Sequence, residues 1–342
     1  MFMSLWNDPE LAKIFLKAIP LIDVRAQVEF EDGAIPHSVN LPIMVNEERA
    51  QVGTCYKAEG QAAAIKLGHE LVNGKVKEER IALWDKYIKE NPGTQVFCFR
   101  GGLRSQITCQ WLREKGHDLY PIKGGYKRLR NFFLSCINEA PIPPLYRVGG
   151  LTGTGKTTFI NALPNSIDLE GLAVHRGSAF GNYSIQPSQV TFENNLGLAL
   201  LKARQFKNII LEDESATLGK ITLPARFFSD LRDAPMAVIR IDHEKRVQNI
   251  FIDYVKGSNA EYFLNGMLRI KKRLSSVYYE ELVKQITLAF GNGFKLEEHE
   301  PWITMLLKFY YDPLYEKDLK RNAHLIVFEG SEVEVRQYLT SL

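Results

Sequence analysis

The amino-acid sequence predicts an α/β protein with two units, each built on a mainly parallel sheet that helices cover. Three observations support this prediction. Short β-rich runs alternate with helical patterns in both halves, the segment "NEAPIPPLY" (138–146) concentrates prolines between them, and helical patterns dominate residues 243–322. Strands that alternate with helices are joined by crossovers, which favour parallel pairing. We expect one domain over residues 1–138 and a second, with a helical C-terminal region, over residues 139–342.

In the first half, the expected elements follow from the spacing of apolar residues and from turn residues. Strands are expected at 19–25, 37–42, 94–99 and 118–125. Helices are expected at 62–72, 79–90, 103–116 and 126–137. The third of these helices closes at Gly116, because glycine is favoured directly after a helix.

In the second half, a strand at 145–150 follows the proline-rich segment and begins a new α/β pattern. Further strands are expected at 208–214 and 236–242, with helical patterns between them, and a final strand at 324–330. This order predicts a second parallel sheet that is independent of the first.

Composition excludes several classes of protein. Hydrophobic residues make up 45% of the chain and charged residues 24%, as in folded soluble domains. A net charge of +3 permits a nucleic-acid partner but does not indicate one, since that would need clustered basic residues. The four cysteines form no C-x-x-C pair, which argues against a disulfide framework or a zinc site. With no signal-peptide pattern and no apolar run of about 18 residues, we expect a cytoplasmic protein without a membrane span.

The segment "GLTGTGKTT" (150–158) fits the phosphate-loop pattern G-x-x-x-x-G-K-[ST], with a strand before it and a helical pattern after it. Glycines let backbone N–H groups approach phosphate oxygens, while a helix start and a lysine add positive charge. The candidate phosphate-binding residues are Gly150, Gly153, Thr154, Gly155, Lys156, Thr157 and Thr158. The pattern indicates a phosphate or diphosphate ligand without identifying ATP, and its alternative is a glycine-rich turn that binds nothing.

An acidic segment follows another expected strand. The run "IILEDES" (209–215) has the pattern of a strand that supplies a carboxylate to a phosphate-bound metal ion. Asp213 is the first candidate, with Glu212 and Glu214 beside it, and the Thr157 hydroxyl is a further candidate ligand for Mg²⁺. No other metal and no tightly bound cofactor is expected.

The segment "FCFRGGLRS" (97–105) places Cys98 between an expected strand and an expected helix. Backbone N–H groups at this point, with Arg100 and Arg104 nearby, are expected to lower the pKa of the thiol and favour a thiolate. Two chemistries use this arrangement: a phosphatase, because Cys98 and Arg104 fit C-x5-R, or a sulfurtransferase. Phe97, where such phosphatases carry a histidine, argues against the first. A buried packing cysteine is the remaining alternative.

An upstream segment resembles the signature of the rhodanese family. The matching residues in "LIDVRAQVEFEDGAIPHSVNLP" (21–42) are Asp23, Arg25, Glu29, Gly33, His37, Asn40 and Pro42. The resemblance implies a rhodanese-like fold in which the Cys98 loop carries a terminal chalcogen. Because rhodanese-like phosphatases exist, the fold alone leaves both chemistries open.

Over nearly its full length, the chain resembles the bacterial tRNA 2-selenouridine synthases, in which a rhodanese unit is fused to a phosphate-loop unit. The matching stretches are "VGTCYK" (52–57), "CFRGGLRS" (98–105), "GGYKRLR" (124–130), "GLTGTGKT" (150–157), "HRGSAFG" (175–181) and "YYDPLYE" (310–316). The chain departs from the family at Phe99, where tryptophan is expected, and at "KKRLSS" (271–276), which lacks an expected glycine. The resemblance implies a rhodanese-like parallel-sheet domain followed by a P-loop NTPase-like α/β domain with a helical C-terminal region.

The same resemblance implies a tRNA-modifying enzyme. That family replaces the sulfur of wobble 2-thiouridine with selenium from selenophosphate, and it is associated with geranylation of the sulfur by geranyl diphosphate. Selenophosphate and geranyl diphosphate would then be co-substrates, and tRNA the macromolecular partner. The resemblance assigns the diphosphate to Gly153, Gly155, Lys156 and Thr157, and the selenium to Cys98 with Arg100 and Arg104.

Other stretches give further candidate substrate contacts. His175 and Arg176 are expected to face the phosphate loop, and a turn without a ligand is the alternative. Lys127 and Arg128, in "YKRLRN" (126–131), are candidates for contact with the tRNA phosphate backbone, and a solvated helix face is the alternative. The aromatic residues of "YYDPLYE" are expected to pack in a core rather than to stack on bases.

Functions of a different class fit the same motifs. One is an ATP- or GTP-dependent kinase or NTPase that carries a rhodanese-like sulfurtransferase or phosphatase domain. Another is a non-catalytic RNA-binding regulator, for which Cys98 would be dispensable. The sequence carries no signal for an oligomeric state.

Overall fold

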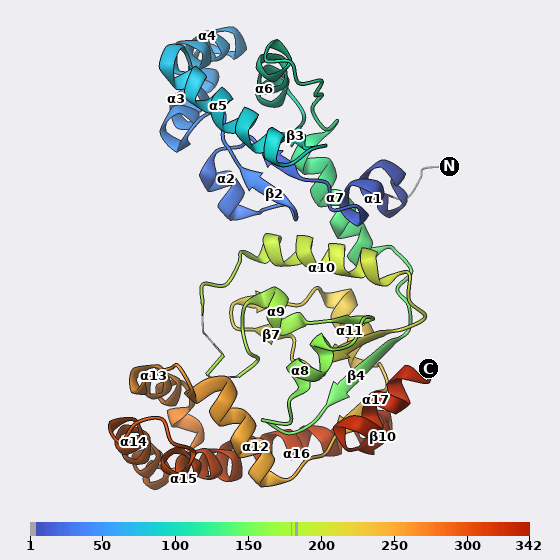
Figure 1. Ribbon diagram of the computed structural model, residues 1–342, viewed down its shortest axis with the longest axis vertical. Coiled ribbons are helices and arrows are strands. Elements are labelled where there is room, and N and C mark those ends of the chain that lie inside the picture. Colours follow the sequence, from blue (N-terminus) through green and yellow to red (C-terminus); the bar gives the residue numbers. More distant parts are fainter. Residues whose placement is uncertain (1–4, 179, 182–183) are drawn as a thin grey trace. The chain divides into compact units, whose positions relative to one another are not determined.

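The structure, a computed structural model, describes residues 5–178, 180–181 and 184–342 (Figure 1). The chain divides into two compact units. Unit 1 consists of Met1–Ala140 together with Pro187–Lys202, and unit 2 consists of Pro141–Gln186 together with Ala203–Leu342. A segment from the second half of the sequence therefore belongs to unit 1.

Unit 1 contains a three-stranded parallel sheet with the order β2-β1-β3. Its strands are β1 (Leu21–Asp23), β2 (Ser38–Asn40) and β3 (Gln95–Phe97), each shorter than expected. The strand expected at 118–125 is reduced to one bridge between Val96 and Pro121. Proline has no N–H with which to extend a ladder of hydrogen bonds, which explains the difference.

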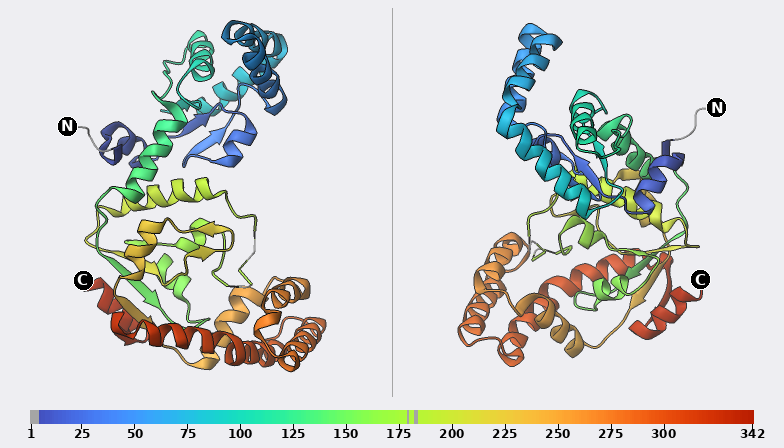
Figure 2. Two further views of the ribbon diagram at one scale, coloured as in Figure 1. Left: turned by 180° about the vertical axis from the view of Figure 1, so that it is seen from behind. Right: turned by 45° about the horizontal axis from the view of Figure 1, so that its top comes forward.

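The helices of unit 1 include one pair that the apolar pattern did not fully predict. They are α1 (Pro9–Leu16), α2 (Gln27–Asp32), α3 (Asn46–Glu59), α4 (Gln61–Leu71), α5 (Gly74–Glu90), α6 (Leu103–Glu114), α7 (Gly125–Asn138) and α10 (Gln189–Ala203). No residue of α3 is buried, so its sequence carries little of the usual periodicity. It packs against α4 across Gly60, and the pair extends away from the sheet of unit 1 (Figure 2).

Two apolar clusters form the core of unit 1. One packs α1 and α7 on the sheet through Phe132 and Phe133, and it includes Leu198 and Leu201 of α10. The other packs α5 and α6 on β1 and β3 around the buried Trp84. The two leucines explain why α10 belongs to this unit despite its position in the sequence.

Unit 2 contains a five-stranded parallel sheet with the order β10-β9-β4-β6-β5. Its strands are β4 (Leu145–Gly149), β5 (Ser166–Ile167), β6 (Ile209–Glu212), β9 (Met236–Ile239) and β10 (Ile326–Gly330). A short hairpin of β7 (Thr217–Leu218) and β8 (Ile221–Thr222) is separate from this sheet. Since β4 is the central strand, the loop at its carboxyl end occupies the position where such sheets bind ligands.

The expected α/β class with a helical C-terminal region is confirmed. The helices of unit 2 are α8 (Lys156–Asn161), α9 (Leu169–Ala173), α11 (Ala225–Arg232), α12 (His243–Ile250), α13 (Ala260–Ile270), α14 (Ser276–Gly291), α15 (Leu296–Leu306), α16 (Asp312–Arg321) and α17 (Glu332–Thr340). Helices α12 to α15 pack around the buried Phe263 and Trp302. No helix within the described ranges is long and apolar enough to cross a membrane.

Candidate functional sites

The loop between β4 and α8 has the backbone conformation that a phosphate cradle needs. Gly150, Gly153 and Gly155 have φ angles of 148°, 83° and 81°, which residues with a side chain rarely adopt. A Cβ atom on Gly153 would lie 2.8 Å from the carbonyl oxygen of Arg246. Glycine is therefore required here both by conformation and by space.

The threonines of the loop have three different environments. Thr154 is buried, and its hydroxyl donates to the Leu151 carbonyl oxygen at 2.9 Å, which stabilises the turn. Thr157 lies in the first turn of α8 and donates to Glu170 Oε2 at 3.1 Å. Thr158 is exposed on the same helix. Thr157 is thus the threonine placed among charged groups.

Lys156 lies at the start of α8 with its ammonium group turned toward the loop. Nζ donates to the Gly150 carbonyl oxygen at 2.9 Å. Burial lowers the pKa of Lys156, and the nearby carboxyl groups of Glu214, Glu170 and Glu212 offset this lowering only in part. The ammonium group is therefore held where a phosphate oxygen would approach the loop.

Glutamates from separate segments gather at this lysine. They are Glu170 in α9, Glu212 at the end of β6 and Glu214 just beyond that strand. Burial, with the nearby carboxyl groups of Glu170 and Asp168, raises the pKa of Glu212 to about 8. Burial also raises the pKa of Glu170 and, more strongly, that of Glu214. The sequence did not predict Glu170, since only the fold brings α9 beside β6.

Asp213, the first candidate for a metal ligand, binds a different partner. Its Oδ1 accepts a hydrogen bond from Arg147 Nη1 at 2.7 Å, and the Arg147 side chain is fully buried. Successive side chains of an extended segment point to opposite faces, so Asp213 points toward Arg147 while Glu212 and Glu214 point toward Lys156. The structure therefore favours Glu212 and Glu170 over Asp213 as the carboxylates beside Thr157.

The group around Thr157 fits Mg²⁺ only in part. Glu212 is 1% exposed, and its Oε1 atom has no hydrogen-bond partner in the described structure. No cluster of three or more His, Cys, Asp or Glu side chains arranged to hold a metal ion occurs among the described residues. A free carboxylate oxygen beside a hydroxyl suits Mg²⁺ that takes its other ligands from phosphate and water.

The segment "YYDPLYE" supports the phosphate loop. Asp312, the first residue of α16, accepts from Arg246 Nη1 and Nη2 at 3.1 and 2.5 Å. Arg246 is buried, and its Nε donates to the Thr152 carbonyl oxygen at 2.8 Å. The Tyr315 ring lies over the loop lysine, with its centroid 5.4 Å from Lys156 Nζ. The acidic and aromatic residues of this segment thus hold the loop rather than only filling a core.

The described part of "HRGSAFG", which excludes Ala179, lies against the glutamates. A Cβ atom on Gly177 would lie 2.7 Å from Glu170 Oε1 and 2.8 Å from Glu214 Oε2. Gly177 therefore lies beside the carboxyl groups that surround Lys156, while the expectation that His175 and Arg176 face the phosphate loop stays a prediction.

His175 and Arg176 have different surroundings. His175 is buried, and burial together with the charge of Arg269 lowers its pKa, which favours the neutral ring. Arg176 donates from Nη1 to the Asp253 carbonyl oxygen, and its guanidinium carbon lies 4.6 Å from the Tyr254 ring centroid. These contacts give the Arg176 side chain a structural role in unit 2, whereas the Nδ1 atom of His175 is buried without a hydrogen-bond partner in the described structure.

In unit 1, Cys98 directly follows β3 and is buried, with 3% of its surface exposed. The Ser105 hydroxyl lies 3.1 Å from Cys98 Sγ, which lies 3.8 Å from the Gly102 carbonyl oxygen. Among the described residues, no hydrogen-bond acceptor is found for the backbone N–H groups of residues 99–105. At the start of α6, such free N–H groups favour a bound anion.

The two arginines of this loop differ in their contacts. Arg104 binds both carboxylate oxygens of Glu29, at 2.6 and 3.1 Å, and Arg49 Nε lies 2.9 Å from the same carboxylate. Burial raises the pKa of Glu29, but hydrogen bonding and charge from Arg104 and Arg49 outweigh it, so the pKa is lowered. Arg100 is exposed, with its guanidinium carbon 5.8 Å from the Phe99 ring centroid. Sequence reasoning gave Glu29 only as part of the rhodanese signature, not as the partner of Arg104.

Gly125 of "GGYKRLR" contacts the backbone of the cysteine loop. Gly125 has a φ of 53°, and a Cβ atom there would lie 2.2 Å from the Cys98 carbonyl oxygen. That oxygen accepts from Tyr126 N at 2.8 Å. Phe99 stacks on the Tyr126 ring, with centroids 5.9 Å apart, so phenylalanine fills the place of the expected tryptophan.

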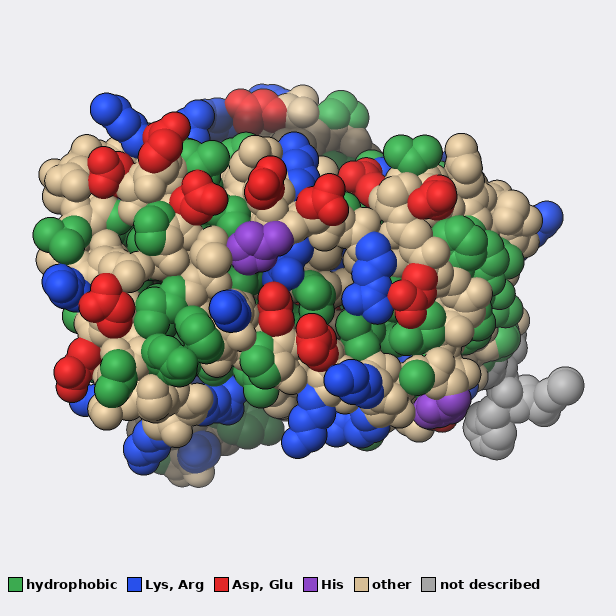
Figure 3. All heavy atoms as spheres, turned by 90° about the horizontal axis from the view of Figure 1, so that it is seen from below, with side chains coloured by type: hydrophobic (Ala, Val, Ile, Leu, Met, Phe, Trp, Pro, Cys, Tyr) green, Lys and Arg blue, Asp and Glu red, His purple; other side chains and the backbone are tan. Residues whose placement is uncertain are grey.

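Arg128, expected to contact tRNA, is engaged within unit 1. Its Nη2 binds Asp8 at 2.6 Å and Glu10 at 2.7 Å, which neutralises its charge. Lys127 is exposed, and its backbone N donates to the Phe99 carbonyl oxygen at 3.0 Å. Basic and acidic side chains are also interspersed on the face shown in Figure 3. The structure therefore favours Lys127 over Arg128 as an RNA contact.

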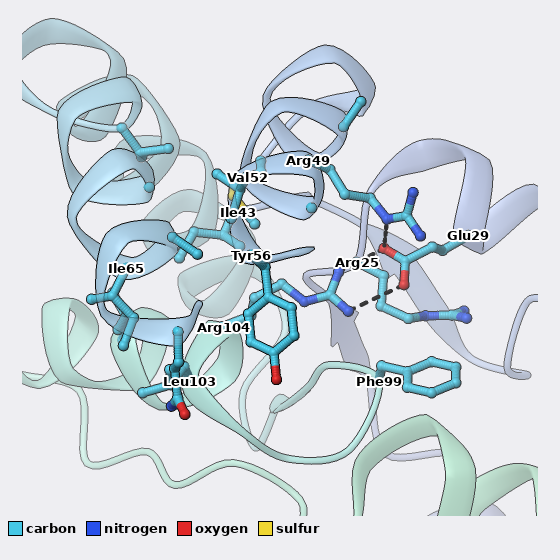
Figure 4. A pocket seen from close by; sticks show the side chains of 18 of the residues that line it. Arg25, Glu29, Ile43, Arg49, Val52, Tyr56, Ile65, Phe99, Leu103 and Arg104 are labelled. Atoms are coloured by element: carbon cyan, nitrogen blue, oxygen red, sulfur yellow. Dashed lines mark hydrogen bonds and ion pairs between the residues drawn. The ribbon is translucent and has the colours of Figure 1, made fainter. Parts of the chain in front are cut away.

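A cavity of about 1190 Å³ opens beside the cysteine loop, entirely within unit 1 (Figure 4). We call it the unit 1 cavity. Helices α3 and α4 supply Val52, Tyr56, Ala64 and Ile65, and the start of α6 supplies Leu103. Further lining residues are Arg25, Glu29, Ile43, Arg49, Lys57, Val72, Phe99, Arg104, Ile107, Trp111 and Tyr126. Sequence reasoning missed this cavity, because its walls come from elements far apart in the chain.

Comparisons with known proteins agree with both units. Residues 143–342 match the family described as "tRNA 2-selenouridine synthase AAA domain", and residues 8–131 match the "Rhodanese-like domain" family. A protein of Shewanella denitrificans named tRNA 2-selenouridine synthase is 41% identical, over 97% of this chain and 97% of the relative. Proteins of the same name from a further Shewanella species and from Photobacterium profundum are 43% and 42% identical. These matches cover 95% and 99% of this chain, and 96% and 99% of the relatives.

Proposed function

The chain belongs to the tRNA 2-selenouridine synthase family, and from this premise we propose that it exchanges sulfur for selenium in wobble 2-thiouridine of tRNA. The observation that carries the proposal is the match over nearly the full chain to relatives with that name. The two candidate sites support it. An exchange that first activates sulfur and then transfers selenium needs a site for each step, and each unit contributes one.

We assign the activating step to unit 2. The thiouridine sulfur attacks C1 of geranyl diphosphate, a C–S bond forms, and the C–O bond breaks with its electron pair on the departing diphosphate. Lys156 and the loop N–H groups around Gly153 and Gly155 stabilise the charge that develops on the diphosphate. Mg²⁺ bound through Thr157 and Glu212 would supply further neutralisation of that charge.

We assign the exchange step to unit 1. The selenium of selenophosphate adds to C2, and the C2–S bond breaks with its electron pair on the departing geranyl thiolate. Water then cleaves the Se–P bond, which releases inorganic phosphate and leaves selenium on C2 with no change of oxidation state. Cys98 holds or delivers the selenium. The free N–H groups of residues 99–105 and the charge of Arg104, fixed by Glu29, support negative charge at this loop. The exposed Arg100 and Lys127 are the proposed contacts with tRNA phosphates.

The test incubates the full chain with thiolated tRNA, geranyl diphosphate and selenophosphate, and analyses the nucleosides by mass. We expect geranylated thiouridine followed by selenouridine. Lys156→Ala should stop geranylation, whereas Cys98→Ala should spare geranylation and stop selenium entry. A wild-type chain that forms neither product would refute the proposed function. Selenouridine formed at the normal rate by Cys98→Ala would refute the role of Cys98.

The phosphate loop also favours a second candidate function, an ATP- or GTP-dependent kinase or NTPase that carries a rhodanese-like domain. Hydrolysis of ATP that tRNA stimulates and Lys156→Ala abolishes would support this function. Tight binding of geranyl diphosphate with no turnover of ATP or GTP would contradict it.

A further inference from the structure

We propose that the unit 1 cavity binds the apolar S-alkyl group of the thioether intermediate and so holds the modified base at the Cys98 loop. The inference rests on the proposed function, because it takes an S-geranylated base as the ligand. A volume of about 1190 Å³ exceeds the range of about 300–1,000 Å³ common for small-molecule pockets. The cavity therefore has room for a base and a prenyl chain together.

The interior of the cavity is apolar. Ile43, Ala64, Val72 and Trp111 line it, and each is nearly fully buried. Ile65 and Leu103 point into the same space from α4 and α6 (Figure 4). Leu103 and Phe99 also line the cavity and are 44% and 39% exposed, so a hydrocarbon chain that covers them gains free energy by excluding water from their surface.

Helix α3 gives independent support for an apolar ligand. This helix of 14 residues packs against α4, yet none of its own residues is buried. Helices in proteins are stabilised mainly by burying an apolar face. The α3 residues that line the cavity include Val52 and Tyr56, and Tyr56 is 58% exposed. A chain lying against these residues would complete the packing that α3 lacks.

The rim of the cavity carries positive charge. The charged lining residues are Arg49, Lys57 and Arg104 against the carboxylates of Glu29 and Asp32, while Arg25 is paired with the buried Asp23, so one positive charge is left over. An alkylated nucleotide combines an apolar chain with anionic phosphates, and the cavity combines an apolar interior with a basic rim. This match favours an alkylated RNA over an uncharged lipid.

The position of the cavity connects it to the exchange chemistry. Phe99, Leu103 and Arg104 all line it, and all three belong to the segment that follows Cys98. An S-alkyl chain anchored against α3 and α4 would therefore place the attached base beside this loop. The alkyl chain of the departing thiolate would stay in the apolar interior while the C2–S bond breaks.

A binding experiment with prepared RNA tests the inference without the activating step. An anticodon stem-loop RNA that carries S-geranyl-2-thiouridine is compared with the same RNA carrying S-methyl-2-thiouridine, using fluorescence anisotropy and the full chain. We expect the geranylated RNA to bind at least about tenfold more tightly. Equal affinity for the two RNAs would overturn the inference.

Cavity-filling variants test whether the unit 1 cavity causes the tighter binding of the geranylated RNA. Ile65→Trp and Ala64→Trp should reduce the difference between the two RNAs to about twofold or less and leave geranylation of thiolated tRNA unchanged. Ala62→Trp is the matched control, since Ala62 is exposed on α4 and does not line the cavity. A full geranyl preference retained by a folded cavity variant would overturn the inference.

Photo-crosslinking gives a readout that needs no variant. RNA carrying an S-alkyl chain with a terminal diazirine should label peptides of α3, α4 or α6 in the wild-type chain. Labelling confined to unit 2 would overturn the inference. The proposed function fails separately, when thiolated tRNA is never geranylated although the prepared geranylated RNA binds in the cavity.

Discussion

Glu212 illustrates how burial changes the chemistry of a single carboxyl group. It is 1% exposed at the end of β6, and one of its oxygens has no hydrogen-bond partner in the described structure. Because water cannot solvate the charged form there, the protonated form is favoured and the pKa rises from 4.5 to about 8. In the unfolded chain the group regains its ordinary pKa, so folding is linked to pH.

This linkage predicts that unit 2 loses stability as pH rises. Between pH 4.5 and about 8 the folded state keeps a proton on Glu212 that the unfolded state releases, so the free energy of unfolding falls. The slope for one proton is at most about 1.4 kcal/mol per pH unit. Urea denaturation at pH 5.5 and 8.0 should show the loss for the wild type and a smaller loss for Glu212→Gln.

The surface pair Arg240–Glu329 provides the control for this comparison. Both side chains are more than 40% exposed, so Glu329→Gln should leave the pH dependence as it is in the wild type. An identical slope for the wild type and Glu212→Gln would contradict the assignment of the proton to Glu212.

Individual site residues could be predicted from the sequence only where a local motif demands them. Lys156 and Thr157 follow from the phosphate-loop spacing, and Cys98 follows from the glycines and arginines around it. Glu170, beside the lysine, has no such local signal, because its place depends on how α9 packs against β6. The acidic run alone favours Asp213 over Glu212, since the face to which each side chain points is known only once the strand's position in the sheet is known.

At the scale of elements, the cysteine loop depends on a turn that follows it in the sequence by about twenty residues. Gly125 begins α7 with a φ of 53°, and no room exists for a Cβ atom beside the Cys98 carbonyl oxygen. Resemblance to the family marks the motif "GGYKRLR", but only the structure shows its physical role in holding the loop.

Gly125→Ala should therefore displace the cysteine loop. A strained backbone costs on the order of 1–3 kcal/mol, and the clash adds to it, so we expect selenium incorporation to fall at least about tenfold. Geranylation should persist. Gly93→Ala is the matched control, because Gly93 also has a positive φ but nothing within 4 Å of a new Cβ atom. Equal losses in the two variants would contradict the specific role of Gly125.

The contact between α16 and the phosphate loop predicts a second effect at this scale. The ion pair of Arg246 and Asp312 is largely buried, and breaking such a pair by removing one partner costs about 3–5 kcal/mol. Arg246→Met and Asp312→Asn should each raise the KM for geranyl diphosphate, and the double variant should be little worse than either. A double-mutant cycle measures this coupling, and strictly additive effects would contradict it.

At the scale of the whole molecule, the sequence predicts the order of the two units along the chain but not which segments belong to each unit. Alternating strands and helices and the proline-rich segment at 138–146 indicated two α/β units. The placement of α10 in unit 1 could not be predicted, because Leu198 and Leu201 would suit either core and only packing with Phe132 and Phe133 decides it. Helix α3 could not be predicted either, because it buries no residue and its sequence therefore lacks the apolar periodicity of most helices.

Each candidate site lies wholly within one unit, so the two proposed steps can be tested on two different variants of the chain. Lys156→Ala lacks the proposed activating step and Cys98→Ala lacks the proposed exchange step. If the geranylated tRNA is released between steps, a mixture of the two variants should form selenouridine although neither variant does so alone. The product should appear after a lag, because the intermediate must first accumulate in solution. Mass analysis over time measures this, with each variant alone and a Lys156→Ala/Cys98→Ala double variant as controls. No product from the mixture, with geranylated tRNA accumulating, would show that both steps must occur on one chain.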